Sequence, residues 1–427
     1  MKWILAWCLL AAPLAAQQAA PLPPAPAAAA AVPLAVLVRE AERANPAILA
    51  ARRAWRAAQQ EPSQASALPD PEFEFGAMNV GGPLPLTGEP DQMMGYAGVG
   101  VSERFPWPGK LRLRGQMARR QAAMSREALA ALRRRIRAAV AGAYYQLGGL
   151  RQTLAVLERD RRLLAAVAQI ATARYRVGEG NEADVLKAQL QLTRLLAEET
   201  VQQRQWDTLQ ARLTDLLNRP LGSAAIEPTT LGESPPPPPP GQLRAGVAAN
   251  PALRIRALEA ARRQLGVKLA RRNFYPDLQV GYMYQATGPG LPYRTNLTVG
   301  ISLPVFWHRK QDAALAQASA QAAEAQEAFG AETDRLRYQA RQWYLQARAD
   351  ERLLHIDRGG LLPQAAAAWR ATLAEYESGR EDFETVMAAF LDYQNLQEIY
   401  WQTLAEHETA LAQLRAVTGN WLARRPA

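Results

Sequence analysis

The sequence repeats itself, and this tandem repeat limits the fold more than any other feature. Five short motifs occur twice in the same order: Asn45-Pro46 and Asn250-Pro251, Pro69-Asp70 and Pro276-Asp277, Val99-Gly100-Val101-Ser102 and Val299-Gly300-Ile301-Ser302, Tyr175-Arg176-Val177-Gly178 and Tyr376-Glu377-Ser378-Gly379, Val185-Leu186 and Val386-Met387. The spacing between the two copies stays between 200 and 207 residues. Chance matches would not keep both order and spacing, so we expect two copies of one structural unit.

Each copy has the same order of predicted elements: a helix of roughly thirty residues, two short strands around a Gly/Pro-rich loop, and a long helical hairpin. The strands are predicted at 72–79 and 95–105 in the first copy and at 278–286 and 295–305 in the second. The first repeat is placed at 34–220 and the second at 243–420, with a Pro-rich connector at 221–242 and a tail at 421–427. The predicted fold class is mainly α with a small β portion.

The N-terminus has the pattern of an export signal. Lys2, an apolar stretch from Ile4 to Ala12 and the small residues Ala15 and Ala16 predict a signal peptide at 1–16, followed by a Pro/Ala-rich linker at 17–33. The single cysteine, Cys8, lies inside this leader, so we expect no disulfide and no lipidated cysteine in the mature chain. After the leader no apolar run has the length of a membrane-spanning helix, so any membrane crossing is expected to use strands.

The predicted strands alternate apolar and polar residues, most clearly at 278–285 and 297–303. This pattern fits a barrel with one face in lipid, but a half-buried soluble sheet would look the same. The second and fourth strands end in similar aromatic segments, and their side chains are candidate membrane-interface residues: Phe105, Trp107, Phe306 and Trp307. Four strands cannot close a barrel, because open edges leave backbone groups without partners in hydrocarbon. Three copies would supply twelve strands.

The helical segments are long. A helix from Asp184 to Asn218 would measure about 50 Å, and the arm before it, 111–176, would exceed that even if it broke at Gly148-Gly149. The turns between the arms are predicted at 177–181 and 378–382, where glycine ends one helix and Asn181 or Asp382 begins the next. Such hairpins would reach far from the strands.

The repeats, the Tyr-x-x-Gly turns followed by Val-Leu or Val-Met, the Pro-Asp before a strand and the segment 299–306 together resemble the outer-membrane efflux protein (TolC-like) family over nearly the whole mature chain. The segment 105–110 resembles the branch associated with heavy-metal cation efflux. This resemblance implies a homotrimer with a 12-stranded β-barrel in the outer membrane and a periplasmic α-barrel made of the helical hairpins. It also implies that the hairpin tips contact a periplasmic adaptor coupled to an inner-membrane pump.

The family resemblance places five residues at the adaptor contact: Tyr175, Val177, Gly178, Tyr376 and Gly379. The best-known member closes its aperture partly with two acidic residues after the second tip, but the matching positions here are Thr385 and Ala388. Four nearby acids are candidate substitutes: Asp184, Glu381, Asp382 and Glu384. The alternative is that these carboxylates stand at helix starts because the helix dipole favours them there.

The sequence offers no catalytic constellation. The three histidines stand apart without metal-ligand spacing, and no phosphate-binding loop, nucleophile elbow or dinucleotide motif is present. The net charge of +10 comes from arginines scattered along helices, which does not predict nucleic-acid binding. We therefore expect a non-enzymatic conduit without cofactor or metal, in the outer membrane with a periplasmic extension. The alternatives are an exit duct for type I protein secretion and a soluble periplasmic coiled-coil scaffold or adaptor.

Overall fold

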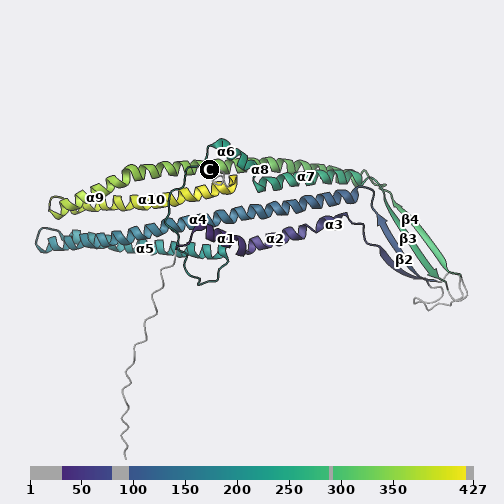
Figure 1. Cartoon of the computed structure of the whole chain (residues 1–427), viewed down its shortest axis with the longest axis horizontal. Coiled ribbons are helices and arrows are strands. Elements are labelled where there is room, and N and C mark those ends of the chain that lie inside the picture. Colours follow the sequence, from purple (N-terminus) through teal and green to yellow (C-terminus); the bar gives the residue numbers. More distant parts are fainter. Residues whose placement is uncertain (1–30, 79–95, 288–291, 420–427) are drawn as a thin grey trace, which may run out of the picture.

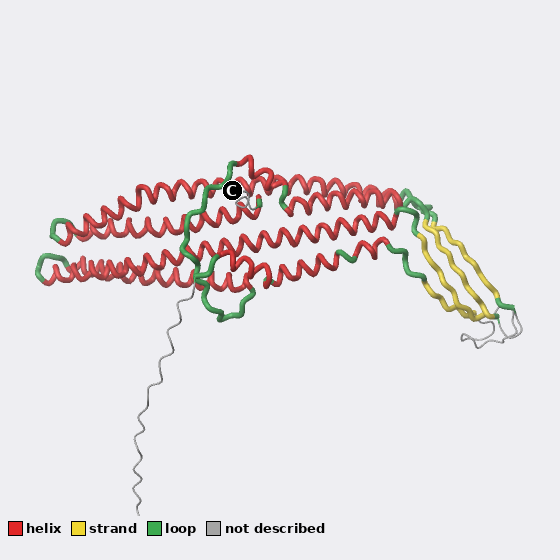
Figure 2. Tube along the Cα trace, viewed as in Figure 1, coloured by secondary structure: helices red, strands yellow, loops and turns green. Residues whose placement is uncertain are grey.

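The computed structural model describes residues 31–78, 96–287 and 292–419. It is an elongated molecule in which long, nearly parallel helices form a body and a sheet continues from one end (Figure 1). Coloured by secondary structure, the strands gather at that end and the helices fill the rest (Figure 2). The predicted signal peptide, residues 17–30 of the linker, the tail 421–427 and the outermost predicted strand residues Asn79 and Gly95 lie outside the described residues.

The element order repeats as the sequence predicts. The first repeat contains α1 (Leu34–Ala44), α2 (Pro46–Ala58), α3 (Glu61–Ser66), β1 (Glu72–Met78), β2 (Tyr96–Phe105), α4 (Lys110–Arg176) and α5 (Glu182–Leu217). The second contains α6 (Pro240–Ala248), α7 (Pro251–Arg272), β3 (Asp277–Ala286), β4 (Arg294–Ser302), α8 (Gln311–Ile356), the π-helix η1 (Asp357–Leu361), α9 (Leu362–Glu377) and α10 (Phe383–Thr418).

The hairpins of the two repeats have equal lengths. Helix α4 has 67 residues, and α8, η1 and α9 follow one another without a gap with 46, 5 and 16 residues, which is the same total. The returning helices α5 and α10 have 36 residues each. At 1.5 Å per residue α4 is about 100 Å long and each returning helix about 54 Å. Both hairpins therefore end at the same distance from the sheet.

The predicted thirty-residue helix at the start of each repeat is divided at the Asn-Pro motif. Asn45 caps α2 by accepting a hydrogen bond from the Ala47 amide at 3.0 Å, and Asn250 caps α7 through the Ala252 amide at 2.8 Å. Each asparagine also donates from its amide nitrogen to a carbonyl near the end of its own repeat, Leu216 O at 2.9 Å and Val417 O at 2.7 Å. The motif thus joins the first and last helices of each repeat, and proline can occupy the first helical position because its missing N–H is not needed there.

Helix α4 runs without a break through Gly148-Gly149, where the sequence left an interruption open, so the predicted long arm is continuous. At this point α10 packs closely against α4, and the close contact is possible because residue 149 has no side chain. A Cβ on Gly149 would lie 2.7 Å from the Ala405 Cβ and 2.9 Å from the Trp401 carbonyl oxygen. Glycine at this position therefore allows two helices to approach closely, instead of ending one of them.

The four strands form one antiparallel sheet in the order β1-β2-β3-β4. One face carries Phe73 and Phe75 on β1, then Val99 and Val101, then the alternating residues of β3, and on β4 Leu297, Val299 and Ile301. The side chains on β1 and β4 are largely exposed in the single chain, whereas those on β3 are exposed by about two fifths and Val101 is half-buried. Strand β4 ends at Ser302 and not at the predicted Val305, because its pairing with β3 ends there and Pro304 has no N–H to donate.

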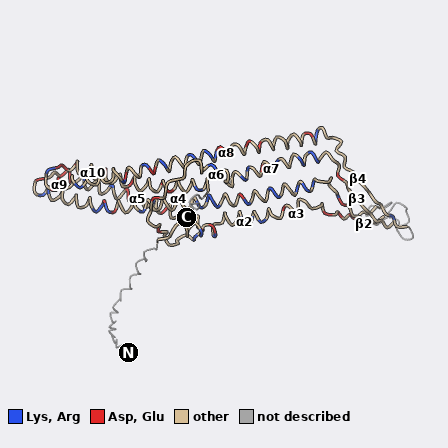
Figure 3. Tube along the Cα trace, turned by 45° about the horizontal axis from the view of Figure 1, so that its top comes forward, with Lys and Arg blue, Asp and Glu red and all other residues tan. Residues whose placement is uncertain are grey.

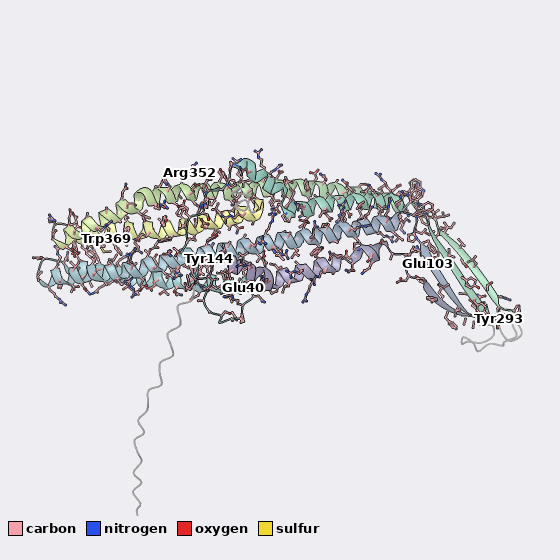
Figure 4. All side chains as sticks on the ribbon, viewed as in Figure 1. Glu40, Glu103, Tyr144, Tyr293, Arg352 and Trp369 are labelled. Atoms are coloured by element: carbon pink, nitrogen blue, oxygen red, sulfur yellow. The ribbon has the colours of Figure 1, made fainter. Side chains whose placement is uncertain are left out.

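The connector between the repeats crosses the helical body near its middle. Val32 forms an isolated parallel bridge with Pro228, and the Tyr144 hydroxyl lies 3.0 Å from the Val32 carbonyl oxygen and accepts from the Thr229 amide at 2.9 Å. Figure 4 labels Tyr144 at this level of the body. Ser234 donates from its amide to the buried Glu408 carboxylate at 2.6 Å. Helix α6 begins at Pro240, inside the predicted connector, which therefore ends earlier than expected.

Candidate functional site

The end of the molecule farthest from the sheet consists of two turns, which we call the first tip (177–181) and the second tip (378–382). Each turn contains one glycine with a left-handed backbone, Gly178 at φ 79° and Gly379 at φ 75°. The following helices begin with the predicted caps, because Asn181 accepts from the Ala183 amide and Asp382 from the Thr385 amide at 2.7 Å. The turns therefore have the predicted chemistry.

The predicted docking residues differ in exposure. Val177 is 70% exposed and Tyr175 is 47% exposed, so the first tip offers apolar surface at its end. Tyr376, the counterpart of Tyr175 in the second tip, is only 3% exposed, and its ring packs edge to face with Phe383 at 5.9 Å between centroids. The two tips are therefore equivalent in backbone but not in surface, and Tyr376 supports the second tip from inside.

One arginine joins the two tips. Arg174, at the end of α4, lies with its guanidinium carbon 4.7 Å from the centre of the Tyr376 ring and donates to the Tyr376 carbonyl oxygen at 2.7 Å. Its other terminal nitrogen donates to the Glu179 carbonyl oxygen in the first tip. Because the cation contacts both repeats, it holds the two hairpin ends together. Sequence reasoning missed Arg174, although it directly precedes the Tyr-x-x-Gly motif.

A second contact between the hairpin ends involves the predicted aperture acids. Lys187 on α5 pairs with Glu384 on α10, and this hydrogen bond, with the nearby carboxylates of Asp184 and Asp382, raises the pKa of Lys187. The Thr385 amide holds the pKa of Asp382 below its usual value, as expected for a helix cap. Asp382 therefore has a structural role at the start of α10, and Glu384 lies opposite a cation. Glu381 is half-buried in the second tip.

The hairpins also meet at a half-buried carboxyl group farther from the tips. The Gln394 amide nitrogen on α10 lies 2.9 Å from Glu398 Oε1 and 3.3 Å from Glu198 Oε2 on α5. Burial, together with the neighbouring carboxylates of Glu198 and Asp160, raises the pKa of Glu398 to about 7. An open groove of about 530 Å³ between α4, α5 and α10 begins at Glu398 and is lined mainly by glutamine, threonine and glutamate side chains. No sequence motif indicates this cluster, because its members come from different repeats.

The junction between sheet and helices carries the predicted aromatic residues, and the two repeats use them differently. Trp107 stacks on Tyr275 at 5.3 Å, and its amide donates to Asp277 at 2.8 Å. Phe105 is half-buried beside them. In the second repeat Phe306 is 78% exposed and Trp307 is 42% exposed. The second segment therefore leaves aromatic surface free in the single chain, while the first is used for packing inside it.

Charged residues of both signs are spread along the helices (Figure 3). Within the described part of the chain, no helix is both long enough and apolar enough to cross a membrane. Among the same residues, no cluster of three or more histidine, cysteine, aspartate or glutamate side chains has the arrangement of a metal site.

Comparison with known proteins identifies the first repeat. Residues 37–219 match the family model described as outer membrane efflux protein. A search of curated proteins found no match. Among solved structures, the outer-membrane channel OprN is similar with a TM-score of 0.79 at 17% identity, covering 90% of this chain and 89% of that one.

Two further channels have the same fold. The outer membrane protein VceC from Vibrio cholerae gives a TM-score of 0.78 at 19% identity, covering 91% of this chain and 96% of that one. The MtrE outer membrane channel from Neisseria gonorrhoeae, solved in its open state, gives 0.77 at 15% identity, covering 91% and 89%. At these identities the likeness establishes the fold, and it includes both repeats.

Proposed function

We propose that this chain is a member of the outer membrane efflux protein family and the outer-membrane channel of a tripartite efflux system, because residues 37–219 match that family's model and the second repeat has the same architecture. It would be a passive conduit from the periplasm to the exterior of a Gram-negative cell. Among the described residues no metal-binding cluster is found, and a conduit requires no catalytic group.

The single observation that best supports this proposal is the exposed apolar face of the four-stranded sheet. Phe73 is 85% exposed and Leu297 68% exposed, although a protein in water would cover such side chains. The sheet also has two free edges, β1 and β4, whose backbone groups need partners in lipid. Three copies would join these edges into a closed barrel of twelve strands, and the hairpins would form the helical barrel below it.

The tips are the proposed docking surface for the periplasmic adaptor, which is coupled to the inner-membrane pump. Val177 and Tyr175 supply exposed apolar surface, while Gly178 and Gly379 set the turns and Tyr376 supports the second tip. Opening would separate the hairpin ends, and adaptor binding would favour this state by contacting it better than the resting state. Asp184, Glu381, Asp382 and Glu384 remain the proposed aperture acids, with Glu384 and Asp382 close to Lys187.

The proposal is tested by extracting the protein from an outer-membrane fraction in mild detergent and measuring its native mass, then recording single-channel currents in planar bilayers. We expect a trimer that forms an ion-conducting pore. A water-soluble monomer or dimer would contradict the channel and favour the periplasmic scaffold. The cargo, including the metal cations suggested by the resemblance at 105–110, is tested separately by tolerance assays in cells that lack the gene.

A further inference from the structure

The boundary between the two repeats inside one chain contains a specific ion pair. Strands β2 and β3 pair there, and just beyond them Lys110 donates from Nζ to Asp277 Oδ1 at 2.7 Å and to the Tyr275 carbonyl oxygen at 3.0 Å. Lys110 is only 5% exposed. The cation after the last strand of one repeat thus binds the acid that begins the first strand of the next repeat.

The hairpin registers identify the counterparts of these residues at the free edges. In the first hairpin Glu72 is opposite Ser102, and in the second Asp277 is opposite Ser302. Ser102 and Ser302 are equivalent positions of the Val-Gly-x-Ser motif. Glu72 is therefore the structural counterpart of Asp277, and both are the first residue of their strand.

This register corrects the sequence alignment by two residues, because the Pro-Asp motif alone would equate Asp277 with Asp70. On the other side, the 200-residue spacing of the Val-Gly-x-Ser motif makes Lys310 the counterpart of Lys110. Both Glu72 and Lys310 are exposed, and within the described residues neither of them forms an ion pair. In its described part the chain therefore has an unpaired acid, Glu72, at one edge of its sheet and an unpaired cation, Lys310, beyond the other edge, and these are the counterparts of Asp277 and Lys110.

The same equivalence gives an apolar register between copies. Inside the chain Phe105 is opposite Leu278 and Glu103 is opposite Val280. By the same offsets, Leu303 and Val305, which follow the end of β4 in the single chain, would lie opposite Phe75 and Phe73 of a neighbouring copy if β4 were extended there as β2 is. Phe73 and Phe75 lie on the apolar face of the sheet, and a shift by one residue would move them to the other face.

From these observations we propose that Lys310 of each copy forms an ion pair with Glu72 of the adjacent copy, at the junction between the barrel and the helices. This inference rests on the proposed trimer, in which β4 of one copy pairs with β1 of the next. Its partner is a second copy of this chain, and three such ion pairs would reproduce between subunits the interaction that Lys110 and Asp277 make within one.

A charge exchange tests the pair. Glu72→Lys and Lys310→Glu are each expected to weaken trimer formation, and the double variant is expected to restore it. Removing one ion pair should reduce association roughly fivefold, and removing all three should lower the trimer association constant roughly a hundredfold. The measurement is native mass in mild detergent over a dilution series, with circular dichroism to establish that each variant is folded.

Asp70 provides the matched control, because it is the partner that sequence alignment alone would choose. Asp70→Lys should leave the trimer unchanged, and combining it with Lys310→Glu should not restore association. Rescue by Asp70→Lys instead of Glu72→Lys, or no rescue by either, would overturn the proposed pair. A wild-type protein that is not a trimer would instead overturn the proposed function on which the pair rests, so the two failures give different results.

Discussion

At the scale of single residues, the most unusual side chain is Glu398, a half-buried carboxyl group on α10. Its pKa is raised from 4.5 to about 7, chiefly by burial and further by the Glu198 carboxylate on α5. The folded state therefore favours the protonated acid. This contribution to stability is fully present below about pH 4.5 and is lost as the pH rises through about 7.

We predict that Glu398→Gln, which keeps the side chain neutral, stabilises the protein at pH 8 and has little effect at pH 4. The gain should be about 1 kcal/mol, because partial exposure screens the interaction. Thermal unfolding of the detergent-solubilised protein at both pH values measures it. Glu406→Gln, at an exposed position on the same helix, serves as the control. A variant that melts like the wild type at pH 8 would contradict the assigned protonation.

At the scale of elements, the close contact between α4 and α10 requires a residue without a side chain at position 149. We predict that Gly149→Ala lowers the free energy of unfolding by about 1–2 kcal/mol, because the clash with Ala405 and Trp401 outweighs the better helix propensity of alanine. Gly148→Ala is the control on the same helix, since its Cβ would meet Leu231 at an ordinary 3.6 Å. The unfolding midpoint should therefore fall for Gly149→Ala and rise for Gly148→Ala. If both variants were more stable than the wild type, α10 would have to shift away from residue 149 without an energetic cost.

The elements themselves could largely be predicted from the sequence. Strand positions, hairpins and turns follow from the hydrophobic period, the glycines and the capping residues, which are local properties of the chain. The long arm that became α4 was predicted, but the sequence left open whether it continues through Gly148-Gly149, because the effect of Gly149 depends on a helix some 250 residues later in the chain. The end of β4 was also missed, since strand length depends on the partner as well as on the alternation. The π-helix η1 has no signal in the periodicity.

At the scale of the whole molecule, the two hairpins pack against each other along their length and are joined at their tips by Arg174 and by the Lys187–Glu384 pair. Trp369, labelled near that end in Figure 4, packs with Phe390 at 5.2 Å and belongs to a core formed by both hairpins. That core keeps the hairpins aligned, while Arg174 sets the distance between the tips. Most interactions of the candidate site are of this kind, between repeats, and the sequence could place its residues on the turns but could not predict which would be buried.

We predict that Arg174→Ala increases the resting conductance of the pore in planar bilayers severalfold, because the two tips lose their shared cation and separate more readily. Arg352→Ala is the matched control, since this arginine is exposed on α8 and lies away from the tips (Figure 4). Equal conductance of the Arg174 variant and the wild type would show that the tips are held by other interactions.

The equal lengths of the two hairpins limit how such a chain can change during evolution. A deletion of seven residues from each of α4 and α5 alone would withdraw the first tip by about 10 Å and leave the second in place. The two tips would then no longer lie at the same level. Only changes made in both repeats at once would keep a rim against which another protein could seat. The lengths of the two hairpins are therefore expected to change together, although each hairpin is encoded by its own stretch of sequence.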